Sequence, residues 1–197
     1  YHIIIEGMEF IDNLIAAENI DCHFNRCGAF EAAAKPQHLD WMRERTKLLS
    51  EVFDHHTEVI SSSDQAKFIG SQLYHGGWHD PLGATFHPAR FVSGLAKAAL
   101  DAGAELHPHS PVMAIEKDGS GYEVQTPRGS IRVKSIILAS NGYTEELVPA
   151  LRRRIIPLNI KAIATEALPV ELAEQLFPER YCYWDTFRLF HYYQRTN

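Results

Sequence analysis

The sequence predicts an α/β fold of the mixed α+β kind, in which helices and strands follow one another along the chain. Apolar residues recur at helical spacing near the start, at Ile4, Met8 and Ile11. Residues 121–134 instead carry two short runs of alternating apolar and polar side chains, the pattern of a β-hairpin. The run SIILAS at 135–140 is apolar without alternation, which is typical of a strand covered on both faces.

Composition places the chain among globular proteins and excludes several classes of partner. The 197 residues are 45% hydrophobic and 22% charged, and this length suits one domain or one domain interrupted by part of another. The formal net charge of −6 offers no basic face to a nucleic acid. No run approaches the roughly 20 apolar residues that span a bilayer. We therefore expect neither a nucleic acid nor a membrane as partner.

The cysteines indicate the cellular compartment of the protein, and the first residue indicates whether the sequence is a whole protein. Cys22, Cys27 and Cys182 are odd in number and lack the C-x2-C spacing of a zinc site. We therefore expect free thiols in a reducing compartment, which predicts a cytoplasmic protein. The sequence begins at Tyr1 rather than at a methionine. We expect it to be an internal portion of a longer protein.

Helices and short strands alternate over the first seventy residues. We expect an amphipathic helix at 3–17, followed by a strand and turn over 23–34 with Gly28 near its middle. A second helix should follow Pro36, because proline suits the first turn of a helix. Its apolar positions continue to Phe53, where we expect it to end.

The next segment is richer in turn residues. The cluster SSSD at 61–64 offers caps for a short helix that ends at Gly70. Residues 72–88 contain glycine or proline every few positions, which predicts loops and short strands. A third helix should run over 88–102 and end at Gly103, and its many small residues allow close packing on a sheet.

Successive strands are expected after this helix, and the last of them ends abruptly. The expected strands cover residues 104–108, 111–117, 121–126, 129–134 and 135–140. Asn141 and Gly142 then tolerate the positive φ that a sharp exit turn requires. Ligands in α/β sheets lie at such strand ends, where small residues let a phosphate or ring approach the backbone. The alternative is a plain turn in which Thr144 caps a helix over 145–151.

Residues 87–168 carry an ordered series of further features. These are a helix after a proline, the segment AGAEL, a valine at Val112, a hairpin with the turn TPRG, the run ILASNGYT and the segment IATEAL, which we expect to be a strand. The series resembles the FAD-dependent amine and amino-acid oxidases of the D-amino-acid oxidase and glycine oxidase family. Within this family it looks like the bacterial gamma-glutamylputrescine oxidases and their relatives.

The resemblance implies a division of the chain into three segments. Residues 1–86 would belong to a substrate-binding domain, 87–153 to an FAD-binding domain, and 154–197 to the substrate-binding domain again. It also implies that Val112 lies beside the FAD adenine. The residues implied to pass close to the dinucleotide are Ala139, Ser140, Asn141 and Gly142.

One element of the family pattern has no counterpart in this sequence. The family binds the FAD pyrophosphate with a G-x-G-x-x-G turn between a strand and a helix. Gly119-Ser120-Gly121 only imitates this motif, because it joins two hairpin strands. We therefore expect FAD as the cofactor of the intact protein and weak or no FAD binding by this chain alone.

The resemblance also implies a reaction and two candidate catalytic residues. The reaction is oxidation of the C–N bond of a small amine or amino acid, with an imine and hydrogen peroxide as products; gamma-glutamylputrescine is one possible substrate, which would place the protein in putrescine catabolism. Residues 187–195 read as a strand with His191 and Tyr193 on one face. His191 matches a position where relatives place a substrate-contacting tyrosine or histidine. The alternative is an aromatic core strand with a hydrogen-bonded histidine.

Other polar clusters carry weaker signals. His75 and His79 lie four residues apart, but the glycines between them break a helix and no carboxylate completes a set, so we expect no metal site. His55 is expected to be solvated, and the arginines at 152–154 suit the end of a helix. A non-catalytic binding domain that kept the sheet and lost the flavin site is the alternative to an enzyme.

Overall fold

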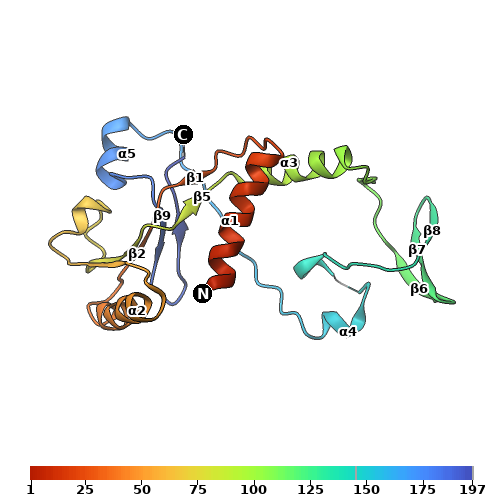
Figure 1. The fold of residues 1–197 in the computed structure, drawn as a ribbon, viewed down its shortest axis with the longest axis horizontal. Coiled ribbons are helices and arrows are strands. Elements are labelled where there is room, and N and C mark those ends of the chain that lie inside the picture. The colour runs from red at the N-terminus through yellow and green to blue at the C-terminus, as the bar shows by residue number, and fades with distance from the viewer. Residues whose placement is uncertain (145, 197) are drawn as a thin grey trace. The chain divides into compact units, whose positions relative to one another are not determined.

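The computed structural model describes residues 1–144 and 146–196, which form two compact units (Figure 1). The first unit comprises Tyr1–Gly103 and Thr165–Asn197, and the second comprises Ala104–Ala164. The chain thus leaves the first unit after its third helix and returns to it later. Helices and mixed sheets together confirm the predicted fold class.

The first unit holds most of the regular structure. In chain order its elements are α1 (His2–Ala17), β1 (Asn25–Arg26), β2 (Ala29–Ala32), α2 (His38–Phe53), β3 (Glu58–Ile60), the 3-10 turn η1 (Gln65–Lys67), β4 (Gly77–Asp80), β5 (Ala84–Thr85), α3 (Pro88–Asp101), α5 (Val170–Leu176), β9 (Cys182–Asp185) and β10 (Tyr192–Tyr193). Helices α1, α2 and α3 begin and end within two residues of their predicted bounds. None of the described helices has both the length and the apolar character that a membrane span needs.

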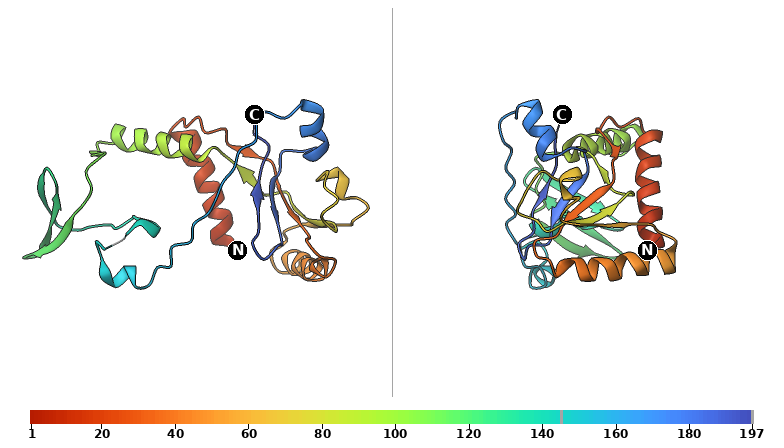
Figure 2. Two further views of the ribbon diagram at one scale, coloured as in Figure 1. Left: turned by 180° about the vertical axis from the view of Figure 1, so that it is seen from behind. Right: turned by 90° about the vertical axis from the view of Figure 1, so that its left-hand side faces the viewer.

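A five-stranded sheet organises this unit, with strand order β10-β9-β2-β4-β3. The central strand β2 pairs parallel with β9 and antiparallel with β4, and Figures 1 and 2 show β2 and β9 side by side. All four β2 residues are buried, because the strand has neighbours on both edges and packing on both faces. Successive residues point to opposite faces, so Phe30 and Glu31 belong to different layers.

The two faces of the sheet bury different clusters. On one face Phe30, Tyr74 and Tyr183 form the larger aromatic core. On the other face Met42 of α2 packs with Trp78 of β4. Aromatic side chains from several strands are therefore part of the core on both faces of the sheet.

The end of α2 brings a predicted surface residue into the interior. Asp54 adopts a left-handed conformation with φ 52° and ψ 33°, which reverses the chain after the helix. His55 is consequently buried, and its Nε2 lies 2.9 Å from Oδ1 of Asp80. The expectation that His55 is solvated is therefore wrong, whereas its neighbour His56 is exposed.

The second unit is built on a three-stranded antiparallel sheet in the order β6-β7-β8. Its elements are β6 (Ala114–Asp118), β7 (Gly121–Thr126), β8 (Gly129–Val133), the 3-10 turn η2 (Asn141–Tyr143) and α4 (Pro149–Arg152). Thr126 pairs with Gly129 across the predicted hairpin turn, which is confirmed. The expected strand at 104–108 is not present, and β6 starts three residues later than expected.

Residues 135–140 do not form the predicted buried strand. Ile137 is 92% exposed, and no described strand pairs with this segment. A strand becomes buried on both faces only when neighbours pair with both of its edges and other elements cover it. The expected strand at 163–168 is absent for the same reason, since Ile163 is 94% exposed and unpaired with any described strand.

Two further expectations about helices need correction. The helix expected over 145–151 is reduced to α4, and Glu145 lies outside the described residues. Pro149 suits the first turn of a helix but disfavours helical backbone at Val148, which is extended at φ −132° and ψ 90°. The short helix expected to end at Gly70 is only the 3-10 turn η1.

Candidate functional site

The loop between β9 and β10 is folded around one buried carboxylate. Asp185 ends β9, and its side chain is 0% exposed. Its Oδ1 accepts hydrogen bonds from the backbone amides of Phe187 at 3.1 Å and His191 at 3.2 Å. The predicted strand over 187–195 is therefore mostly a loop, and only Tyr192 and Tyr193 pair with β9.

The second oxygen of this carboxylate joins both predicted catalytic residues in one network. Asp185 Oδ2 lies 2.7 Å from Nδ1 of His191 and accepts a hydrogen bond from the Tyr74 hydroxyl at 3.1 Å. The Tyr74 hydroxyl in turn accepts one from Tyr193 at 3.1 Å. Asp185 and Tyr74 therefore connect His191 to Tyr193, and sequence reasoning identified neither of the two connecting residues.

Both phenols of this network are held in their neutral form. Burial raises the pKa of Tyr193, and its hydrogen bond with Tyr74 raises it further. Burial is also the main cause that raises the pKa of Tyr74. Each phenol therefore keeps its proton at neutral pH and acts as a donor in the network.

His191 is the member of the network that a small molecule can reach. Its side chain is 66% exposed, whereas the Asp185 side chain is completely covered. The Phe187 ring lies edge-on to the imidazole, with centroids 6.0 Å apart. On the buried side, Tyr193 stacks on Tyr183 at a centroid distance of 5.8 Å. The arrangement presents one exposed imidazole that is anchored from below by a buried carboxylate.

The segment predicted to approach FAD forms a compact exposed turn. Asn141 has a positive φ of 49°, as its residue type allows, and begins the 3-10 turn η2. The buried Thr144 hydroxyl donates to the carbonyl of Asn141 at 2.9 Å and lies 2.8 Å from the Ser140 hydroxyl. Thr144 therefore stabilises the turn itself rather than capping a helix.

Gly142 does not have the backbone conformation that was expected, but it does have open space beside it. Its φ is not positive, so of the two residues expected to allow a positive φ in this turn only Asn141 adopts one. A Cβ placed on it meets no atom of the described residues within 4 Å, and Ala139 is also exposed. A turn of small residues with open space above it fits the approach of a ring or phosphate. Val112 is partly exposed, at 38%.

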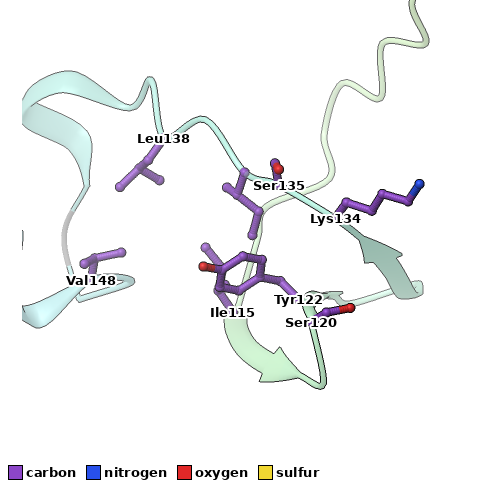
Figure 3. Close-up of a pocket in the computed structure, with 8 residues that line it drawn as sticks. Ile115, Ser120, Tyr122, Lys134, Ser135, Leu138 and Val148 are labelled. Atoms are coloured by element: carbon purple, nitrogen blue, oxygen red, sulfur yellow. The ribbon is translucent and has the colours of Figure 1, made fainter.

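A cavity of about 390 Å³ lies in the second unit, close in sequence to this turn (Figure 3). Figure 3 shows Leu138 and Val148 on one side of the space and Ile115 and Tyr122 on the other. The remaining lining residues are Ser120, Lys134, Ser135 and Ile136. The predicted FAD contacts are not among the lining residues, although Leu138 directly precedes Ala139.

The remaining histidines, cysteines and arginines that were considered in the sequence form no further site in the described residues. In the described part of the chain, no group of three or more His, Cys, Asp or Glu side chains is placed to hold a metal ion. The thiols of Cys22, Cys27 and Cys182 are free. Arg152 pairs with Glu146 at 2.7 Å, at the end of α4.

Comparison with known proteins defines the class of this chain. The family of FAD dependent oxidoreductases called DAO matches residues 1–197. The chain belongs to this family, and FAD is the cofactor of the family. The resemblance noted in the sequence is confirmed.

Two curated bacterial oxidoreductases match nearly the whole of this chain. Gamma-glutamylputrescine oxidoreductase of Escherichia coli K12 is 29% identical over 195 residues, which cover 98% of this chain and 45% of that protein. A probable oxidoreductase OrdL of Haemophilus influenzae is 28% identical over 200 residues, covering 98% of this chain and 46% of that protein. The chain thus spans about half the length of these curated relatives.

Solved structures show the same fold. Glycine oxidase from Geobacillus kaustophilus superposes with a TM-score of 0.67 at 17% identity, covering 75% of this chain and 41% of that one. NikD, an amino acid oxidase of nikkomycin biosynthesis, superposes in its open form with a TM-score of 0.61 at 20% identity, covering 75% of this chain and 38% of that one.

Proposed function

We propose that the protein containing this sequence oxidises the C–N bond of a small amine or amino acid, forming an imine and hydrogen peroxide. The observation that carries the proposal is the family match over residues 1–197. When bound, FAD would supply the hydride acceptor and the route by which the electrons reach dioxygen. The relative from Escherichia coli supports gamma-glutamylputrescine or a similar amine as substrate, and hence a role in putrescine catabolism.

His191 and Tyr193 are the residues that we assign to the substrate side. An amine must lose its extra proton before the hydride leaves, because the nitrogen lone pair forms the C=N bond. The exposed imidazole of His191 accepts that proton, with Nδ1 already engaged by Asp185. Tyr193 supports the site from the buried side through its hydrogen bond to Tyr74. Water then hydrolyses the released imine.

The domain and cofactor assignments belong to the same proposal. We assign residues 1–86 and 154–197 to a substrate-binding domain and residues 87–153 to the FAD-binding domain, with Val112 and residues 139–142 beside the dinucleotide. The return of residues 165–197 to the unit of residues 1–103 supports an interrupted domain. The open turn at Gly142 supports a ligand contact there. The free thiols of this chain support the cytoplasm as the location of the protein.

A direct test measures flavin content and amine-dependent peroxide formation in the purified intact protein. We expect a yellow protein that forms peroxide with at least one member of a set containing gamma-glutamylputrescine, putrescine, glycine and sarcosine. His191→Gln should lower kcat by about 100-fold or more at unchanged flavin content, the range that a general base contributes. A flavin-loaded protein that oxidises no member of the set would contradict the proposal and favour a non-catalytic binding domain.

A further inference from the structure

The geometry of the β9–β10 loop points to a positioning role for a residue that the reaction does not touch. We propose that Asp185 fixes His191 in the tautomer that carries its proton on Nδ1, so that Nε2 is free to accept a proton from a substrate amine. The catalytic part of this inference rests on the proposed function. The positioning part concerns only contacts within this chain.

The contacts of Asp185 assign separate tasks to its two oxygens. Oδ1 accepts the amides of Phe187 and His191, and these bonds shape the loop. Oδ2 faces two side chains, Nδ1 of His191 at 2.7 Å and the hydroxyl of Tyr74 at 3.1 Å. Three of the four contacts are made with donors, the two amides and the Tyr74 hydroxyl, while the role of Nδ1 depends on the tautomer of His191. The bonds to Oδ1 alone are sufficient to hold the loop, so the contacts of Oδ2 serve another purpose.

The contact to Oδ2 determines which imidazole nitrogen carries the proton. A neutral imidazole has one N–H and one lone pair, and a carboxylate oxygen can only accept. Because Nδ1 lies 2.7 Å from Oδ2, the N–H must be on Nδ1 and the lone pair on Nε2. The Asp185 side chain is 0% exposed, so water does not compete with Nδ1 for Oδ2. The carboxylate thus specifies both the tautomer and the direction of the ring.

Residues from a distant segment hold this carboxylate in place. Tyr74 lies 111 positions before Asp185 and donates to Oδ2, while Tyr193 donates to the Tyr74 hydroxyl. Burial raises the pKa of both phenols, so these donors persist at neutral pH. Phe187 packs between the rings of Tyr74 and His191, at centroid distances of 6.2 and 6.0 Å. Asp185 is therefore restrained from two sides.

A purely structural loop cap is the competing explanation, and Asp185→Asn separates the two. The amide oxygen of asparagine can still accept the backbone amides of the loop, whereas its NH₂ group replaces Oδ2. An NH₂ group facing Nδ1 requires a lone pair on Nδ1, which moves the proton to Nε2. A loop cap predicts no such inversion, because its function ends at Oδ1.

The decisive measurement is the tautomer of His191 by ¹⁵N NMR of the intact protein with labelled histidine. His191→Gln identifies the signal by its disappearance, against the signals of the other histidines, which include ten of the 11 in this sequence. In the unmodified protein we expect the proton on Nδ1, and in Asp185→Asn on Nε2. An Nε2-protonated His191 in the unmodified protein would overturn the inference without any variant, so the test survives if Asp185→Asn fails to fold.

A matched control and an activity measurement complete the test. Tyr74→Phe removes one donor to Oδ2 but leaves the contact to Nδ1, so the tautomer should stay as in the unmodified protein. In the FAD-loaded protein, Asp185→Asn should lower kcat by about 100-fold at unchanged flavin content. If the tautomer inverts while His191→Gln is fully active, the positioning role stands and the catalytic proposal fails. If the tautomer does not invert, the positioning role fails whatever the activity.

Discussion

Arg45 joins the helix α2 to the central sheet through charge and aromatic contacts together. Its guanidinium forms an ion pair with the buried Glu31 of β2 and lies over the rings of Trp78 and Trp41, 3.7 and 4.7 Å from their centroids. The indole N–H of Trp78 donates to Thr46, one residue along the helix. A carboxylate on the central strand is therefore tolerated because α2 supplies its partner.

Arg45→Met should lower the free energy of unfolding by about 2–3 kcal/mol, because it leaves the carboxylate of Glu31 buried without its cation. The value is below that of a fully enclosed pair because Arg45 retains 30% exposure. Denaturant unfolding measures the change. Arg43→Met is the control, since its pair with Asp40 on the same helix is exposed and should contribute less than about 1 kcal/mol. Equal effects of the two changes would contradict this account.

His79 makes stability depend on pH. Burial lowers its pKa below the ordinary value of 6.5, as expected for a ring packed against Phe68 and Tyr181. The unfolded chain therefore binds a proton at a higher pH than the folded chain does. The contribution of His79 is fully present above pH 6.5 and is lost as the pH falls from there toward the lowered pKa.

The expected result is a decrease in the free energy of unfolding between pH 7 and pH 5 that becomes shallower in His79→Gln. Denaturant unfolding at several pH values measures the slope. His56→Gln serves as control, because that side chain is 78% exposed, and it should leave the slope unchanged. A His79→Gln protein with the slope of the unmodified chain would show that other groups carry the dependence.

At the scale of elements, the turn before β4 requires a glycine both for its backbone φ and for the close approach of another strand. Gly76 has a φ of +105°, and a Cβ placed on it would lie 2.3 Å from the carbonyl oxygen of Ile60. Its amide also donates to the side chain of Gln65 at 2.7 Å. The close approach lets β3 and β4 pair directly at Ile60 and Gly77.

Gly76→Ala should destabilise the chain by about 2–4 kcal/mol, because strain in φ and a backbone clash act together. Gly103→Ala provides the comparison, since Gly103 has a φ of +90° but no described atom within 4 Å of the position that a Cβ would take. That change should cost only about 1 kcal/mol. Thermal melts of both variants separate the two contributions, and a smaller loss for Gly76→Ala than for Gly103→Ala would refute the steric argument.

The elements that are predictable from the sequence are those whose partners are local. The hydrogen bonds of α1 and α3 join residues four apart, and β7 and β8 meet across a short turn. The run at 135–140 has the composition of a buried strand, but composition does not specify which strand would pair with it. In the site, His191 and Tyr193 follow from the family resemblance, whereas Tyr74 has no local signal because its partner is 111 positions away.

At the scale of the whole molecule, the chain returns to its first unit after an excursion through the second. The return places β9 beside β2, so residues 182–185 complete a sheet that begins at residue 29. The network of Asp185 and Tyr74 therefore depends on a contact between segments that are 111 positions apart. The turn at Gly142, in contrast, lies within the second unit. A change in the network therefore tests the proposed amine site, and a change in the turn tests the proposed FAD contact.

Gly142→Val in the intact protein tests the proposed contact between this turn and FAD. Gly142 is open and free of positive φ, so the folded chain should accept the side chain at a cost within about 0.5 kcal/mol, as for surface positions in general. If the turn lies against FAD, the added bulk instead displaces the cofactor, and flavin per folded protein should fall while the melting temperature of the apoprotein stays unchanged. Ala104→Val, at an exposed position of the same unit, should keep its full flavin content. Because folding and ligand contact are separated at this position, unchanged flavin in Gly142→Val would remove residues 139–142 from the FAD site without disturbing the family assignment.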